Sequence, residues 1–397
     1  MNFSPNSAWI TLAGISAWSL PTLICSLNSL KARALEEAPS EPPFLSKASL
    51  VSILIPARNE AKNLVNTLPT VLEAASRLIQ AGLRAEIILL DDSSSDDTFS
   101  ISNQIAFAHE SVRRGELEVR VLKSQSAPSD GWNGKTSACH HLSKVARGDL
   151  LLFLDADVNL GPLALLRSLS SMVESRGDAL TALPYQIMIG PSERFLIPLI
   201  MHLSIFSFLP LPLVRSSTSA SLSVLNGQFF LIRRHAYDGI GGHTSVKSSL
   251  LEDVELGRRL KKKGYHLEVV TAAHDIQVRM YDSQSAIWEG FGKNLAPLLG
   301  GSSARLAFLN AVFVGALLMV PYFSIALAPS ELLHWIPLVL SGFCRILTGV
   351  LFRYKRPILE ILKQPLQAVL FLVLAVHSIK LRKRNEIYWK GRRIPQS

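Results

Sequence analysis

Residues 149–157 read DLLLFLDAD, five consecutive apolar residues between an aspartate and an Asp-Ala-Asp tripeptide. An apolar run of this length, bounded by polar residues, predicts a strand at Asp149–Leu154 that is buried on both faces. Alternate residues of an extended chain point the same way, so Asp155 and Asp157 can face one cation. Carboxylate oxygens, completed by substrate phosphates, suit Mg²⁺ or Mn²⁺. The stretch therefore predicts a divalent-metal site at the carboxyl end of a buried strand.

Three more strand candidates precede this one, at Leu50–Pro56, Glu86–Leu90 and Leu117–Leu122. Between the first two, Glu60–Gln80 carries apolar residues at helical spacing. Strands that alternate with helices form parallel sheets whose two faces are covered. The predicted fold class is α/β, with a mostly parallel, Rossmann-like sheet and flanking helices.

Polar side chains follow the first two of these strands. Arg58 and Glu60 come after the first strand, and Asp91 and Asp92 come after the second. Ligands of open α/β sheets bind beyond the carboxyl ends of the strands. We therefore expect these groups and the Asp-Ala-Asp tripeptide to converge on one ligand site.

A candidate general base lies further along the chain, where Glu252 and Asp253 open a predicted helix that ends at Gly264. Acidic residues in a first helical turn are also favoured by the helix dipole alone. If the helix start faces the ligand site, Asp253 can take a proton from an acceptor hydroxyl. The sequence leaves both interpretations open.

A candidate phosphate contact is Lys135, in the stretch Trp132-Asn133-Gly134-Lys135. A glycine and a lysine at a helix entrance offer backbone N–H groups and an ammonium to phosphate. The spacing of a P-loop is absent, and an ordinary surface lysine is an equally good interpretation.

Four apolar runs are long enough to cross a bilayer or nearly so, at Trp9–Leu30, Leu306–Ala328, Leu332–Phe352 and Gln364–Leu381. The third carries Arg345, which is costly in lipid unless it faces protein. Three full crossings near the C-terminus would place the basic tail outside the cell, against the positive-inside rule. We therefore expect one of the last two runs to be interfacial or incomplete.

The positive charges lie beside these runs. Lys31 and Arg33 follow the first run, and no lysine or arginine precedes it. This pattern predicts an external N-terminus and a cytosolic domain after the first crossing. The net charge of +10 is concentrated near apolar runs and is not interleaved with aromatic residues, which argues against nucleic-acid binding. The three cysteines form no C-x-x-C pair and support neither a disulfide framework nor a zinc site.

One further apolar stretch, Phe195–Val214, contains three prolines and falls between strands that must share one sheet. It is compatible with a core helix or with an amphipathic segment lying in the membrane surface.

The order of the motifs carries a resemblance. Four motifs follow one another along the chain: Pro-Ala-Arg-Asn-Glu after a strand, then Asp-Asp-Ser-Ser-Ser-Asp-Asp-Thr, then Asp-Ala-Asp and then Glu-Asp. This order resembles that of family 2 glycosyltransferases with the GT-A fold, and it covers about residues 50–294. A finer pattern looks like the membrane-bound bacterial branch associated with hopanoid and carotenoid (diaponeurosporenoate-type) glycosylation. That pattern comprises Gly131-Trp132-x-Gly134-Lys135, Asn226-Gly227-Gln228, Gly241-Gly242-His243, Arg279-Met280-Tyr281 and Trp389-Lys390-Gly391-Arg392.

The resemblance implies an inverting transfer from a nucleoside-diphosphate sugar, with UDP as the expected nucleotide, to a lipid or isoprenoid hydroxyl or carboxyl group. It implies Asp253 as the catalytic base, with Glu252 beside it, and a Mg²⁺ or Mn²⁺ ion at Asp155 and Asp157. The residues implied for nucleotide-sugar binding are Pro56, Arg58, Glu60, Asp91, Asp92, Lys135 and Asp155. Those implied for the acceptor or diphosphate side are Asn226, Gly227, Gln228, Gln284, Trp288 and Arg279.

One position departs from many membrane-bound relatives, which have Gln-x-x-Arg-Trp after the base. Here Gln284-Ser285-Ala286-Ile287-Trp288 places Ile287 where arginine is expected, which argues against a processive polymer synthase. Arg279 or Arg392 could substitute for the missing cation.

The expected organisation is an N-terminal anchor over residues 1–34, a cytosolic GT-A domain over 46–300, and a C-terminal membrane region with a basic tail over 301–397. We expect a multi-pass protein of the inner (plasma) membrane. Two alternatives remain: transfer to a polyprenyl phosphate, which needs no base, and a non-catalytic membrane transport component with a decayed nucleotide domain.

Overall fold

The computed structural model describes residues 5–41, 49–124, 128–203, 209–390 and 392–394. Its backbone contacts divide the chain into two compact units. The helical unit comprises residues 1–32, 188–212 and 281–393, and the sheet unit comprises 33–187, 213–280 and 394–397. Residues 188–212 therefore leave the sheet unit and cluster with the helices from the two ends of the chain.

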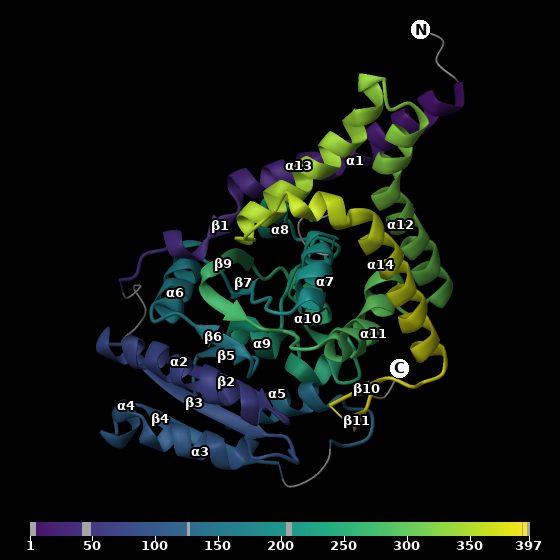
Figure 1. Cartoon of the computed structure of the whole chain (residues 1–397). Coiled ribbons are helices and arrows are strands. Elements are labelled where there is room, and N and C mark those ends of the chain that lie inside the picture. The colour runs from purple at the N-terminus through teal and green to yellow at the C-terminus, as the bar shows by residue number, and fades with distance from the viewer. Residues whose placement is uncertain (1–4, 42–48, 125–127, 204–208, 391, 395–397) are drawn as a thin grey trace. The chain divides into compact units, whose positions relative to one another are not determined.

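A nine-stranded sheet forms the centre of the sheet unit, with the order β1-β9-β7-β8-β5-β2-β3-β4 and β6 paired to β9 (Figure 1). The strands are β1 (Arg33–Ala34), β2 (Leu50–Ala57), β3 (Arg84–Asp91), β4 (Glu118–Lys123), β5 (Leu150–Leu154), β6 (Val158–Leu160), β7 (Ala179–Gln186), β8 (Phe229–Arg233) and β9 (Leu267–Val278). Most pairings are parallel, but β8 runs antiparallel to both β5 and β7. The predicted α/β class with a mostly parallel sheet is confirmed.

Helices cover the sheet because its strands are apolar on both faces. Ile53 and Ile55 join the core cluster beneath the flanking helices, and Leu54 between them is fully buried too. Helix α2 contributes its apolar stripe of Leu64, Leu68 and Leu72, as its spacing predicted. The helices of this unit are α2 (Ala61–Gln80), α3 (Thr98–Ala108), α4 (Glu110–Arg113), α5 (Gly134–Val145), α6 (Ala164–Glu174), α9 (Arg234–Gly239) and α10 (Glu252–Lys262), with short 3₁₀ turns η1 (Leu35–Glu37) and η3 (Gly242–Val246).

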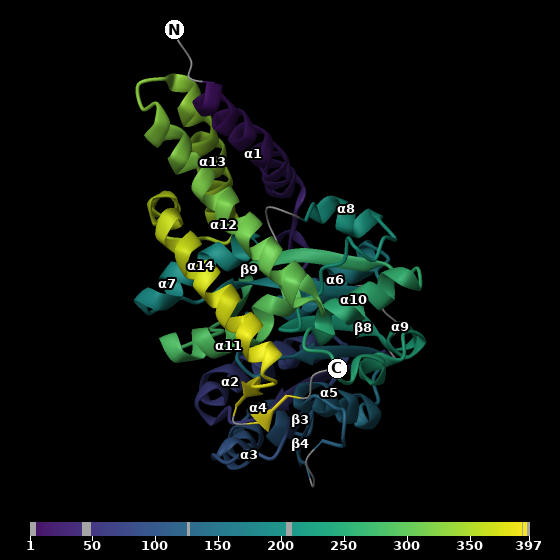
Figure 2. The same ribbon diagram turned by 90° about the vertical axis from the view of Figure 1, so that its right-hand side faces the viewer.

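The helical unit contains the long apolar helices. It comprises α1 (Pro5–Lys31), α7 (Pro191–Met201), α11 (Gln284–Gly300), α12 (Ala304–Leu327), η4 (Leu332–Trp335), α13 (Ile336–Leu351), α14 (Leu359–Lys383) and the hairpin strands β10 (Tyr388–Trp389) and β11 (Arg392–Arg393). Helix α12 packs against α1 and α14, and α1 packs against α13 (Figure 2). Four segments of the described chain are long and apolar enough to cross a membrane: 8–31, 304–327, 332–351 and 359–383. The expectation of one such helix near the N-terminus and two to three near the C-terminus is confirmed; the number that cross stays a prediction.

The apolar stretch Phe195–Val214 contains parts of two helices, α7 and α8 (Leu211–Ser216), while residues 204–208 lie outside the described chain. Most of its described part belongs to the helical unit, so α7 is not a core helix of the sheet unit. Its partners are considered below.

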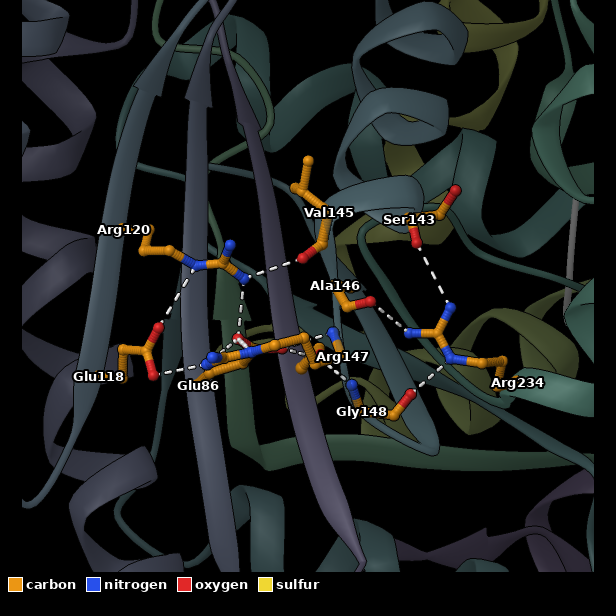
Figure 3. Close-up of polar contacts among 10 residues, drawn as sticks. Glu86, Glu118, Arg120, Ser143, Val145, Ala146, Arg147, Gly148 and Arg234 are labelled. Atoms are coloured by element: carbon orange, nitrogen blue, oxygen red, sulfur yellow. Dashed lines mark hydrogen bonds and ion pairs between the residues drawn. The ribbon is translucent and has the colours of Figure 1, made fainter.

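A cluster of charged side chains around the buried Glu86 lies at the amino-terminal edge of the sheet (Figure 3). Glu86 of β3 is 1% exposed and accepts hydrogen bonds from Ser52 Oγ at 2.6 Å, Arg120 Nη2 at 2.9 Å and the backbone N–H of Arg147 at 2.8 Å. The Arg147 guanidinium binds both Glu86 and Glu118. Burial alone would raise the pKa of Glu86, but the hydrogen bonds from Ser52 and Arg147 and the Arg120 charge lower it below its ordinary value.

Candidate active site

The loops after β2 and β3 are joined to each other at the carboxyl edge of the sheet. Arg58 Nη1 donates to the carbonyls of Asp92 at 2.7 Å and Ser93 at 2.9 Å. The backbone N–H of Asn59 donates to Ser94 Oγ at 2.9 Å, and Asn59 has a left-handed φ of 52°. Arg58, predicted from the resemblance to contact the donor, thus also braces the loop that carries the acidic pair.

Asp91 and Glu60 also form hydrogen bonds in the loops after β2 and β3. Asp91 is 1% exposed, and its Oδ1 accepts from the backbone N–H of Ser94 at 3.0 Å. The N–H of Glu60, the residue before α2, donates to Thr98 Oγ1 at 2.8 Å. Burial would raise the pKa of Asp96, but hydrogen bonds from Thr98 and Ala61 lower it, so this carboxylate stays ionised between the two helix starts.

Lys135 and Asp155 meet although 20 positions separate them. The Lys135 ammonium lies 2.6 Å from Asp155 Oδ1 and 3.7 Å from Glu252 Oε1. Asn133 caps α5 and orients its first turn by accepting from the backbone N–H of Lys135 at 3.2 Å. Burial would lower the pKa of Lys135, but the carboxylates of Asp155 and Glu252 raise it well above its ordinary value. A permanent positive charge therefore sits beside the first aspartate of the tripeptide.

Asp253 lies at the start of α10 and points at the loop before β8. Its Oδ2 accepts from the backbone N–H of Gly227 at 3.0 Å, and its Oδ1 accepts from the N–H of Val254 at 2.8 Å. A Cβ added at Gly227 would lie 3.2 Å from Asp253 Oδ2 and 3.3 Å from Lys135 Nζ. Glycine at this position thus permits the close approach of the backbone, the Asp253 carboxylate and the Lys135 ammonium.

The loop Asn226-Gly227-Gln228 also reaches the Asp-Ala-Asp tripeptide. The backbone N–H of Asp155 donates to the carbonyl of Gln228 at 3.2 Å, because β5 and β8 are antiparallel neighbours. The Gln228 side-chain oxygen accepts from Asn226 Nδ2 and Gln186 Nε2, each at 3.3 Å. The loop therefore connects the candidate base to the candidate metal ligand.

One narrow cavity is lined by six of the predicted residues. The predicted residues that line it are Pro56, Lys135, Asp155, Gly227, Glu252 and Asp253. Sequence reasoning missed the rest of the lining, which is Cys139, Phe153, Leu154, Leu225, Phe230 and Leu256, together with His243 of the Gly241-Gly242-His243 motif. The sequence spacing could have identified two of them. Phe153 lies two residues before Asp155, and Phe230 lies two residues after Gln228, and residues two apart in an extended chain point to the same side.

His243 forms the neutral wall of this cavity. It is 3% exposed, its Nδ1 lies 2.8 Å from Tyr237 Oη, and its ring packs edge-on against Phe153 at 4.7 Å between centroids. Burial, with the nearby Lys135 charge, lowers the pKa of His243 to about 3. The ring is therefore uncharged near neutral pH and shapes the cavity without adding a second cation.

The remaining predicted residues lie elsewhere. Arg58, Glu60, Asp91, Asp92 and Asp157 do not line this cavity. Arg279 follows β9 in the sheet unit. Gln284 and Trp288 belong to α11 in the helical unit.

Gln284 and Trp288 line a groove of about 660 Å³ within the helical unit. Its other lining residues are Ser285, Glu289, Lys293, His377, Leu381, Glu386, Ile387 and Tyr388. The rings of Trp288 and His377 lie 5.7 Å apart between centroids. Ile287, which replaces the expected arginine, is fully buried among the core residues, so its position faces away from solvent.

The turn after β5 carries Asp155 and Asp157, the two aspartates that the sequence predicts as metal ligands. Asp155 and Asp157 flank a turn in which the N–H of Val158 donates to the carbonyl of Asp155 at 3.2 Å. Among the described residues, no group of three or more His, Cys, Asp or Glu side chains is arranged to hold a metal ion. The residues present fit an ion that takes two protein carboxylates and completes its shell with donor phosphates.

Almost half of the chain matches a known protein family. Residues 52–241 match the family model described as glycosyl transferase family 2. The chain therefore contains a glycosyltransferase family 2 domain, as the motif order predicted, and its sheet unit has the GT-A type of fold.

Two named relatives match part of this chain. The chain is 26% identical over 262 residues to 4,4'-diaponeurosporenoate glycosyltransferase of Staphylococcus haemolyticus, and 24% identical over 264 residues to that of Staphylococcus aureus strain USA300. Each match covers 64% of this chain and only 63% of the relative. Both relatives bear the diaponeurosporenoate name that the finer sequence pattern resembled.

A solved structure shares the fold at low identity. Mannosyltransferase PcManGT from Pyrobaculum calidifontis, solved with GDP-Man and Mn²⁺, aligns with a TM-score of 0.57 at 14% identity. The alignment covers 95% of this chain and 98% of that one. At this identity the likeness concerns the fold alone.

Proposed function

We propose that the chain transfers a sugar, with inversion, from a nucleoside-diphosphate sugar to a hydroxyl or carboxyl group of a lipid or isoprenoid. UDP is the expected nucleotide. The observation that carries the proposal is the placement of Asp253 beside Gly227, Lys135 and Asp155 in one cavity. Displacement with inversion needs an acceptor nucleophile, an aligned donor and a stabilised leaving group, and this arrangement offers a group for each.

Asp253 is the proposed base. Each of its oxygens accepts one backbone N–H, from Gly227 and from Val254, which fixes the carboxylate and leaves lone pairs on both oxygens. A carboxylate so held can take the proton of an acceptor hydroxyl as the new bond forms. A carboxyl acceptor is already an anion at neutral pH and has less need of this base.

The proposed donor side combines a lysine with a metal. Lys135 brings a permanent positive charge to the cavity. Asp155 and Asp157 would hold Mg²⁺ or Mn²⁺. When bound, such an ion neutralises the negative charge that develops on the diphosphate leaving group. Arg58, Glu60, Asp91 and Asp92 are the proposed surroundings of the nucleotide.

The proposed acceptor is lipid-soluble because the chain carries four candidate membrane helices and resembles enzymes named for a carotenoid acid. The groove at Gln284 and Trp288 is the proposed acceptor-side surface, since aromatic and polar side chains there suit an amphipathic molecule. We propose a multi-pass protein of the inner membrane with the sheet unit in the cytosol, following the charges after the first helix.

The test uses membranes that contain the full chain. They are incubated with radiolabelled UDP-sugars, GDP-mannose and a lipid extract of the host, and labelled lipids are identified. We expect one labelled lipid in the wild type and none with Asp253→Asn, which should still bind nucleotide sugar. Asp238→Asn is the matched control, because Asp238 is exposed and lies outside the cavity.

Three outcomes would overturn parts of the proposal. Normal transfer by Asp253→Asn would remove the base. Loss of the acceptor after alkaline phosphatase treatment of the extract would point to a polyprenyl phosphate. Absence of any labelled product with any donor would favour the non-catalytic alternative.

A further inference from the structure

Helix α7 contains a break in its own hydrogen bonding. Pro198 lies inside it and has no N–H, so the carbonyl of Arg194 loses its normal helical donor. The carbonyls of Pro198 and Leu199 keep a donor of the main chain, because the N–H of His202 donates to both. The Arg194 carbonyl therefore takes its hydrogen bond from water or from another element.

Side chains of α13 and α14 donate to three carbonyls of α7. Lys363 Nζ donates to Arg194 at 3.1 Å, Gln367 Nε2 donates to Phe195 at 2.5 Å, and Arg345 Nη1 donates to Pro198 at 3.4 Å. Each acceptor lies at, or within four residues before, the proline. Of the three acceptors, the Arg194 carbonyl is the one that the proline deprives of a helical donor, whereas the Pro198 carbonyl also accepts from the N–H of His202.

Glu360 holds the donors in position. Its two carboxylate oxygens bind Lys363 Nζ at 2.7 Å and Arg345 Nη2 at 3.1 Å. Arg345 Nη2 also donates to Gln367 Oε1 at 2.8 Å. Arg345, Glu360 and Gln367 are 2%, 5% and 0% exposed. The arginine in the middle of an apolar run therefore faces protein, as its cost in lipid requires.

We infer that Arg345, Glu360, Lys363 and Gln367 form a docking site for α7, hereafter the carbonyl dock, and that its four members are positioning residues for transfer. A buried ion pair is weak support for stability as such, but it can select one arrangement of the helices that it joins. The dock fixes the segment 188–212 to the helical unit. That segment links β7 to the chain that leads to β8, whose preceding loop binds Asp253 through Gly227.

Hydrogen exchange of the full chain in lipid nanodiscs tests the dock without any assumption about activity. We expect Lys363→Met and Gln367→Met to speed exchange of the α7 amides by about tenfold or more, with α12 unchanged. Lys355→Met is the control, because Lys355 is exposed. Unchanged α7 exchange in both variants would overturn the inference.

A double variant isolates the proline. Pro198→Ala restores the N–H that the Arg194 carbonyl lacks. In that background Lys363→Met should no longer speed α7 exchange. An equal effect of Lys363→Met in both backgrounds would show that the lysine acts in another way.

The catalytic consequence rests on the proposed function and has its own readout. Gln367→Met should lower kcat for transfer to membrane lipid about tenfold while leaving the KM for the donor within about twofold. If no transfer exists in the wild type, the proposed function fails but the exchange result still decides the dock. A raised donor KM with unchanged kcat would overturn the positioning role.

Discussion

Replacing Glu86 by glutamine should destabilise the sheet unit far more than the same change at its neighbour Glu118. Glu86 is 1% exposed and receives hydrogen bonds from Ser52, Arg120 and Arg147, whereas the Glu118 side chain is 48% exposed (Figure 3). Glutamine keeps one acceptor oxygen but turns an amide donor toward a guanidinium that also only donates. The amide N–H groups of the glutamine then face the N–H groups of an arginine, with no acceptor between them.

The expected loss of folding stability follows from how deeply each glutamate is buried. Breaking a fully buried ion pair costs about 3–5 kcal/mol, and partial solvent access reduces this. The side chains of Arg120 and Arg147 are 30% and 54% exposed, so water can replace part of what Glu86 supplied. We therefore expect a loss of about 2–3 kcal/mol for Glu86→Gln and less than about 1 kcal/mol for Glu118→Gln.

Thermal unfolding of the full chain in detergent measures this difference, with protease cleavage of the sheet unit as the probe. For a domain of about 150–250 residues, 1 kcal/mol shifts Tm by about 2–4 °C. Glu86→Gln should lower the transition of the sheet unit by about 4–12 °C, and Glu118→Gln by less than about 4 °C. Equal shifts for the two variants would refute the reasoning.

The same cluster has a predictable pH dependence. The pKa of Glu86 is lower in the folded chain than its ordinary value of 4.5, so its stabilising contribution is complete above that value. The contribution is lost as the pH falls through the lowered folded pKa. The Tm difference between wild type and Glu86→Gln should be constant from neutral pH to about 5 and shrink at lower pH. A difference that grows on acidification would contradict the assignment.

The remaining predictions concern the cavity. Gly227→Ala should lower kcat/KM about tenfold or more, because the added Cβ lies 3.2 Å from Asp253 Oδ2 and 3.3 Å from Lys135 Nζ; a fall in Tm that accounts for the lost activity would remove this explanation. EDTA should stop transfer, and added Mn²⁺ or Mg²⁺ should restore it, since the carboxylates of Asp155 and Asp157 suit such ions; transfer that persists in EDTA would argue against the metal. His243→Phe should retain most activity near neutral pH, because His243 is buried and uncharged there, whereas loss of transfer with intact folding would give the imidazole a chemical role.

Six of the residues named from the resemblance to family 2 enzymes lie together in the structure, while their functional roles stay predictions. Pro56, Lys135, Asp155, Gly227, Glu252 and Asp253 line one cavity, as the motif order implied. Leu154, Leu225 and Leu256 also line the cavity but were missed, because buried apolar residues look the same whether they line a site or a core. Arg58 and Asn59 join the loop after β2 to the loop after β3 by hydrogen bonds. This role depends on which strand lies beside β2, so the local sequence does not show it.

The sequence by itself determined the elements that depend on local pattern: the apolar strand before Asp155, the amphipathic α2 and the long apolar helices near both ends of the chain. Such patterns act over a few residues, through the periodicity of strand and helix. Only the tertiary structure decided which distant groups meet. The antiparallel placement of β8 beside β5 brings Gln228 to the DLLLFLDAD strand, and the partners of Arg345 come from α7 and α14. Contacts between distant segments follow from strand order and helix packing, which no local window of sequence contains.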